Sequence, residues 1–125
     1  MWLNGLTSIS GEAAEVLGSF EGEKLGFGGL TSISGEVAET LANFRGTLWL
    51  NGLASISVEV AKALGSFEGE GLVLDGLTSI SAEVAKDLAN VKGSLGLRGL
   101  TSIDEDVLKI LKSKSKIHLP EKYND

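Results

Sequence analysis

One six-residue phrase recurs five times along this chain at an almost constant spacing. Copies or near-copies of Gly-Leu-Thr-Ser-Ile-Ser begin at Gly5, Gly29, Gly52, Gly76 and Gly99, so the spacing alternates between 24 and 23 residues. A unit of this length is too short to bury its own apolar side chains, and successive units must therefore stack and share one core. The repetition predicts a solenoid that forms a single domain over residues 1–125.

Every unit has the same internal order of predicted elements. A short alternating L-x-L element, as in residues 48–50, comes before the phrase and is typical of a half-buried strand. A segment with apolar residues at helical spacing, as in residues 57–64, follows the phrase. The predicted units are residues 1–23, 24–46, 47–69, 70–93 and 94–116, with a C-terminal cap over 104–125.

Polar residues and glycines set the expected boundaries of the helices. The residues predicted to cap the helix N-termini through side-chain oxygens are Ser10, Ser34, Ser57, Ser81 and Asp104. The glycines expected where the helices end are Gly22, Gly46, Gly69 and Gly93. With right-handed crossovers, this order predicts an α/β solenoid with a parallel β-sheet on the concave side and α-helices on the convex side.

The chain resembles the leucine-rich repeat family through its period and through L-x-L-x-x-L cores such as Leu48, Leu50 and Leu53. The resemblance covers residues 1 to about 119 and implies protein recognition on the strand-lined face. Where the family usually has Asn or Cys after the strand, this chain has Leu6, Leu30, Leu53, Leu77 and Leu100. We therefore expect a divergent, bacterial-type or consensus-like variant in which the Thr and Ser of the phrase supply the turn hydrogen bonds.

Charge and composition restrict the classes of partner. The net charge is −6, and residues 1–103 carry 6 basic and 12 acidic side chains. We expect no nucleic-acid partner, since binding to a phosphate backbone depends on clustered Lys and Arg. There is no cysteine, no apolar stretch of about 18 residues and no basic-then-apolar leader, so we expect no membrane partner and a soluble protein, cytoplasmic by default.

The sequence also lacks the parts of a catalytic site. His118 is the single histidine, has no cysteine partner, and cannot by itself form a triad or a zinc site. The acidic column Glu12, Glu36, Glu59, Glu83 and Asp106 falls in the first turns of the predicted helices, where the helix dipole favours negative charge. We therefore predict a protein that is not an enzyme and has no cofactor or metal.

Two columns of residues are expected to face outward from the sheet. The middle residues of the L-x-L elements are Trp2, Gly26, Trp49, Val73, Gly96 and His118, and we expect them to be exposed. Tryptophan is a preferred interface anchor, although strand propensity with shielding by neighbours also explains it. The next outward column is Asn4, Gly28, Asn51, Asp75 and Arg98, which varies as a binding face does, or is simply a solvated strand end. The predicted partner-binding residues are Trp2, Asn4, Trp49, Asn51, Val73, Asp75 and Arg98.

The two ends of the chain differ in sequence. No polar capping segment precedes the L-x-L element at residues 1–3, which predicts an open edge that pairs with another copy, a fragment of a longer array, or a frayed terminus. At the other end, Lys114 replaces the Phe or Val of earlier units, and residues 116–120 predict a sixth strand stopped by Pro120.

These observations favour one function and leave two alternatives open. The predicted function is non-catalytic protein–protein recognition through the concave sheet face. The first alternative is a self-assembling scaffold, natural or designed, which forms a homodimer through its uncapped N-terminal repeat. The second and weaker alternative is carbohydrate binding on the tryptophan face.

Overall fold

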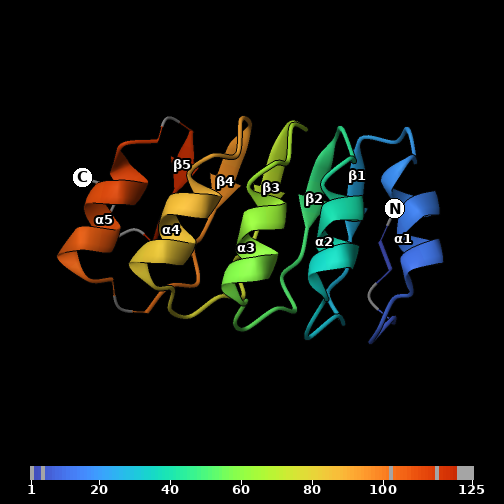
Figure 1. Cartoon of the computed structure of the whole chain (residues 1–125), viewed down its shortest axis with the longest axis horizontal. Coiled ribbons are helices and arrows are strands. Elements are labelled where there is room, and N and C mark those ends of the chain that lie inside the picture. Colours follow the sequence, from blue (N-terminus) through green and yellow to red (C-terminus); the bar gives the residue numbers. More distant parts are fainter. Residues whose placement is uncertain (1, 4, 102, 115, 121–125) are drawn as a thin grey trace.

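Helices and strands alternate along the whole described chain (Figure 1). The structure is a computed structural model that describes residues 2–3, 5–101, 103–114 and 116–120. Its elements are α1 (Gly11–Gly18), β1 (Lys24–Gly26), α2 (Gly35–Leu41), β2 (Thr47–Trp49), α3 (Val58–Leu64), β3 (Gly71–Val73), α4 (Ala82–Leu88), β4 (Ser94–Gly96), α5 (Glu105–Lys112) and β5 (Ile117–His118).

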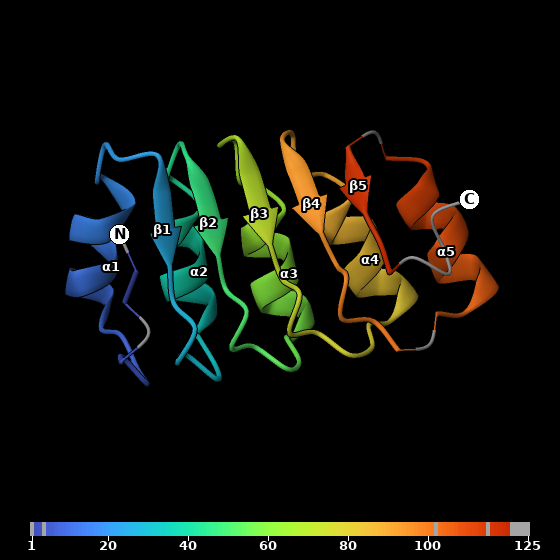
Figure 2. The ribbon, with the colours of Figure 1, turned by 180° about the vertical axis from the view of Figure 1, so that it is seen from behind.

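The strands form one parallel sheet in the order β1-β2-β3-β4-β5, so each strand pairs with the strand of the next unit. The register keeps equivalent positions side by side: Leu25 pairs with Leu48, and Leu48 with Leu72. The helices form a second layer on one face of this sheet, and the view from behind shows the strands uncovered on the other face (Figure 2). The expected repeating α/β arrangement is confirmed.

The core lies between the two layers and is built from the same repeat positions in each unit. The fully buried leucines of the strands and helices are Leu25, Leu48, Leu72, Leu95, Leu41, Leu64, Leu88 and Leu111. Ala14, Ala38, Ala61 and Ala85 are also 0% exposed, as expected for positions where each helix approaches the sheet. Since each unit contributes its apolar face to one shared layer, the core is continuous along the stack.

The helix caps are confirmed at four of the five units. The hydroxyl oxygens of Ser10, Ser34, Ser57 and Ser81 each accept the backbone N–H three residues later, at 3.1–3.2 Å. Asp104 occupies the same N-cap position, but its side chain makes no capping hydrogen bond, so this part of the prediction is wrong. Its backbone is extended, as at the four serine caps, with a φ of −64° against −80° at Ser57.

The prediction that Gly22, Gly46, Gly69 and Gly93 end the helices is wrong. The helix C-caps come earlier, for example at Ala42 and Ala89, and no glycine in the described ranges has a positive φ. Three of these glycines, Gly46, Gly69 and Gly93, instead allow successive turns to approach closely. A Cβ on Gly46 would collide with the carbonyl oxygen of Glu23, and one on Gly93 with that of Glu70.

The two ends of the sheet have different structures. Trp2 makes an isolated parallel bridge with Gly26, and the Leu3 N–H donates to the Gly26 carbonyl at 2.7 Å. Met1, which begins the expected first strand, lies outside the described residues. The expected last strand is confirmed as β5, which pairs with β4.

Candidate functional site

The outer face of the sheet carries the predicted tryptophans at one end. Trp2 is 54% exposed and Trp49 is half-buried. Gly26 lies between them in the register, because it bridges to Trp2 on one side and pairs with Trp49 on the other. A Cβ on Gly26 would collide with the Trp2 ring, so the absence of a side chain lets this ring lie against the backbone.

The two indole rings meet across Gly26. Their centroids are 5.5 Å apart and their planes are tilted by 59°. Tilted aromatic pairs of this kind contribute about 0.5–1.5 kcal/mol beyond the area they bury. The pair therefore holds two large apolar surfaces in one place on the uncovered face of the sheet.

The expected exposure of the full column is wrong in its middle. Gly26, Val73 and Gly96 are buried, and only Trp2 and His118 at its two ends are exposed. Val73 is 9% exposed because it lies in register beside the large Trp49 ring. On its other side, its Cγ1 lies 3.4 Å from the position of a Cβ on Gly96, where no side chain pushes it outward.

A hollow of about 410 Å³ lies beside the tryptophan pair. The described residues that line it are Trp2, Phe27, Gly28, Trp49 and Asn51, none of which is ionisable. The Trp49 indole Nε1 is buried and has no hydrogen-bond partner among the described residues. An unsatisfied buried donor costs about 1–3 kcal/mol, and such groups in a folded protein call for an explanation. The hollow therefore has apolar walls, and one of its lining residues carries a buried donor without a partner among the described residues.

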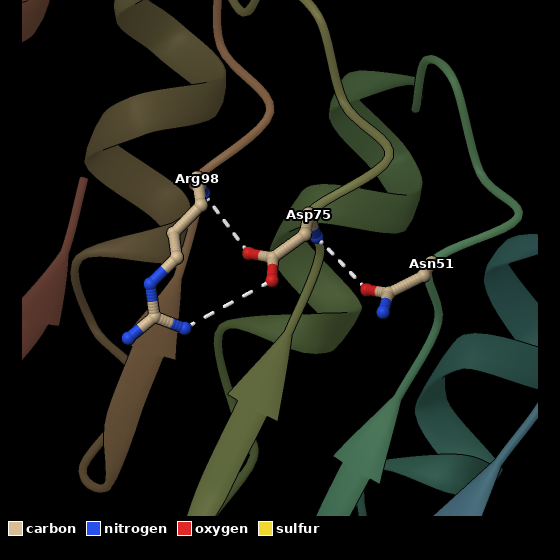
Figure 3. Close-up of polar contacts among 3 residues, drawn as sticks. All are labelled: Asn51, Asp75 and Arg98. Atoms are coloured by element: carbon tan, nitrogen blue, oxygen red, sulfur yellow. Dashed lines mark hydrogen bonds and ion pairs between the residues drawn. The ribbon is translucent and has the colours of Figure 1, made fainter. Parts of the chain in front are cut away.

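The polar column beside the hollow forms a ladder between successive units (Figure 3). The Asn51 Oδ1 accepts the Asp75 backbone N–H at 3.0 Å, and the Asp75 Oδ1 accepts the Arg98 backbone N–H at 2.9 Å. The Arg98 guanidinium also lies 4.0 Å from Asp75 Oδ2, with its side chain 56% exposed. Asn51 and Asp75 thus join neighbouring turns of the stack.

The ladder shows where part of the turn hydrogen bonding comes from. The phrase supplies one such contact, because the backbone N–H and the hydroxyl of Thr101 both donate to the Thr78 carbonyl, at 3.0 and 3.2 Å. This confirms the expected role of threonine at one pair of turns. The contribution of Asn51 and Asp75 was missed, although both are short polar acceptors placed directly after a strand in neighbouring units.

The ladder lacks a side-chain acceptor at Gly28, which occupies the same repeat position one unit before Asn51. Glycine has no side chain to accept the Asn51 backbone N–H. Within the described part of the chain, this N–H has no hydrogen-bond partner, whereas the equivalent groups of Asp75 and Arg98 are both paired. The interruption falls in the lining of the hollow.

The structure brings only some of the predicted binding residues together. Trp2, Trp49 and Asn51 line the hollow, whereas Asp75 and Arg98 continue the ladder away from it. Val73 is buried, and Asn4 lies outside the described residues. The lining residues Phe27 and Gly28 were not predicted as site residues; the available signal was a glycine at a position that carries polar side chains in neighbouring units.

No protein-family model matches this chain, and no curated protein sequence matches it. Among the residues that the structure describes, no group of three or more His, Cys, Asp or Glu side chains is placed to hold a metal ion. No helix in the described ranges is both long and apolar enough to cross a membrane. The fold and the hollow together define a repeating α/β protein with an open site on its sheet face, whose described lining residues carry no charge.

Proposed function

We propose that this chain is a non-catalytic protein-recognition module that binds its partner on the uncovered sheet face, centred on Trp2 and Trp49. The proposal includes a right-handed, leucine-rich-repeat-like solenoid with this face on its concave side. Support for the handedness comes from the parallel strand–helix–strand order, which is right-handed in about 98% of known crossovers.

The observation that carries the proposal is the hollow beside the tryptophan pair. Interface hot spots are enriched in tryptophan because it buries a large apolar area while keeping an N–H donor. The hollow offers two indoles, a backbone N–H and the Asn51 carboxamide, and none of its described lining residues has an ionisable group that could transfer a proton. This chemistry is suited to binding rather than to catalysis.

The test is selection of binding peptides with a matched control. A display library of extended peptides is selected on the wild-type protein, and each recovered peptide is then titrated against Trp49→Ala and Val16→Ala. Val16 is 70% exposed in α1, in the helix layer, and so controls for loss of an apolar surface group. We expect Trp49→Ala to weaken binding by about 30-fold, the usual effect of losing a hot spot, and Val16→Ala to leave it unchanged.

Circular dichroism spectra must show that both variants keep the fold. If no peptide binds, or if the peptides bind Trp49→Ala as tightly as the wild type, the recognition proposal is contradicted.

Self-association is a second candidate function, favoured by the exposure of the first unit. Among the residues that the structure describes, the exposed large apolar side chains are Trp2, Leu6 and Val16, all in this unit. Leu6 is 40% exposed, whereas its counterparts Leu30, Leu53 and Leu77 are fully buried. An exposed core layer of this kind favours pairing of two copies as a homodimer through their first units.

Light scattering over a range of concentrations tests this candidate. We expect a dimer that Leu6→Glu converts to a monomer, because a carboxylate cannot be buried without a partner. The matched control is Leu108→Glu, which places the same charge on a partly buried position at the other end. A wild-type protein that stays monomeric at high concentration contradicts the candidate.

A further inference from the structure

We infer that the hollow binds a carboxamide side chain, Asn or Gln, of the partner protein, and that this group accepts the Asn51 backbone N–H, for which Gly28 has no side-chain acceptor. The inference rests on the proposed recognition function and specifies the chemistry of what is recognised. It follows from the interruption of the ladder, from the position of the hollow and from the charge of its surroundings.

The ladder defines which group fits at this position. In two successive steps, a side-chain carbonyl or carboxylate oxygen of one unit accepts the first backbone N–H after the L-x-L element of the next. The same N–H in Asn51 has no partner among the described residues, and Asn51 is exposed. An oxygen acceptor that enters from solvent can therefore complete the missing step.

The backbone conformation at position 28 does not require a glycine. The φ of Gly28 is not positive, so a residue with a side chain could adopt the same backbone. The same unit has a second glycine, Gly26, in the other column that faces outward from the sheet. Because Gly26 has no side chain, the Trp2 ring has room beside it. Gly26 thus admits an aromatic wall, and Gly28 lines the hollow beside it.

Charge favours a neutral amide over a carboxylate. None of the described residues that line the hollow is a cation, and the protein carries a net charge of −6. The Asp75 carboxylate lies one ladder step away, where Arg98 already accompanies it. A second carboxylate would lose its hydration without gaining a counter-charge, whereas a carboxamide gives the same acceptor oxygen at a lower cost. The indole faces can pack against the apolar stem of such a side chain.

Amide-detected NMR with small probes tests the inference on the full chain. The probes are N-acetyl-asparagine N-methylamide and the matching aspartate and alanine compounds, which differ only in the side chain. We expect the asparagine probe to shift the Asn51 amide proton downfield until the site is saturated, with a dissociation constant in the millimolar range. We expect the aspartate and alanine probes to bind at least fivefold more weakly. Equal effects of the asparagine and alanine probes would overturn the inference.

A sugar could present the same acceptor through an acetamido group, so N-acetylglucosamine is titrated in parallel. Binding of this sugar without binding of the asparagine probe would show that the acceptor comes from a carbohydrate, and would overturn the assignment to a protein side chain.

The variant Gly28→Asn supplies the missing group from within the chain. We expect its Asn51 amide to be shifted downfield without any probe, and the asparagine probe to bind at least tenfold more weakly. Gly28→Ala is the matched control, which adds a Cβ but no acceptor and should bind the probe within about threefold of the wild type. If selected peptides depend on Trp49 but bind Gly28→Asn normally, the recognition function stands and the carboxamide inference fails.

Discussion

The two ends of the stack complete the same repeat in opposite ways. In the first unit, Leu6 is 40% exposed, whereas its counterpart in the last unit, Leu100, is 2% exposed. The glycines that begin the six-residue phrase in these two units differ in the same way. A Cβ on Gly5 would have no described atom within 4 Å, but one on Gly99 would collide with the carbonyl oxygen of Asp75 in the preceding turn. The first unit therefore presents the side of the repeat that normally receives a neighbour.

The last unit is closed by Lys114. Its ammonium group donates to the carbonyl oxygens of Val91 and Gly93, the latter at 2.9 Å. One unit earlier, the equivalent Phe67 carbonyl accepts a backbone N–H from the following turn, that of Lys92. A single charged side chain thus replaces hydrogen bonds that a further turn would supply. The apolar end is thus suited to association, whereas the polar end satisfies its own acceptors.

The largest effect that separates the ends is expected from two leucines at the same repeat position. Leu111 is fully buried, whereas Leu17 is only partly buried. We expect Leu111→Ala to lower the free energy of unfolding by about 2–5 kcal/mol. We expect Leu17→Ala to lower it by less than half as much, because folding removes less of the Leu17 side chain from water. Urea unfolding followed by circular dichroism measures both, and equal losses would refute the difference in packing.

A smaller effect is expected when the polar cap is removed. Lys114→Met keeps an apolar stem but leaves two carbonyl oxygens without their donor. We expect a loss of about 1–3 kcal/mol, the usual cost of unsatisfied groups at a partly buried site. The control is Lys109→Met, an exposed lysine in the last turn of α5, which should change thermal unfolding very little. Indistinguishable behaviour of the two variants would mean that Lys114 does not close this end.

The repeating fold was predictable because each of its causes lies within a few residues. Ser57 caps a helix that begins at the next residue, and the alternation at Leu48 and Leu50 marks a strand. The same local patterns recur in each unit, so register between units follows from the period.

The exposure of side chains on the sheet face was less predictable, because it depends on residues 23 or 24 positions away. Val73 is buried since its neighbours in the register are Trp49 and Gly96, and nothing adjacent in the sequence indicates this. The spacing of Asn51 and Asp75 was visible, but their hydrogen bonds require the Oδ1 of one unit to face the backbone N–H of the next. The hollow likewise arises only once Gly28 is placed beside Asn51.

The smallest expected effect is a pH dependence that only the closed end should show. Burial lowers the pKa of Lys114 below 10.5, and the nearby charge of Lys116 acts in the same direction. The folded state therefore holds this proton less tightly than the unfolded chain, so the cost of burying the charge is fully present below the folded pKa. That cost is removed as the pH rises through the folded pKa toward 10.5, and stability rises with it. We expect the stability difference between the wild type and Lys114→Met to grow over this window, and a difference that shrinks or stays constant in urea unfolding would contradict the assigned burial of the ammonium group.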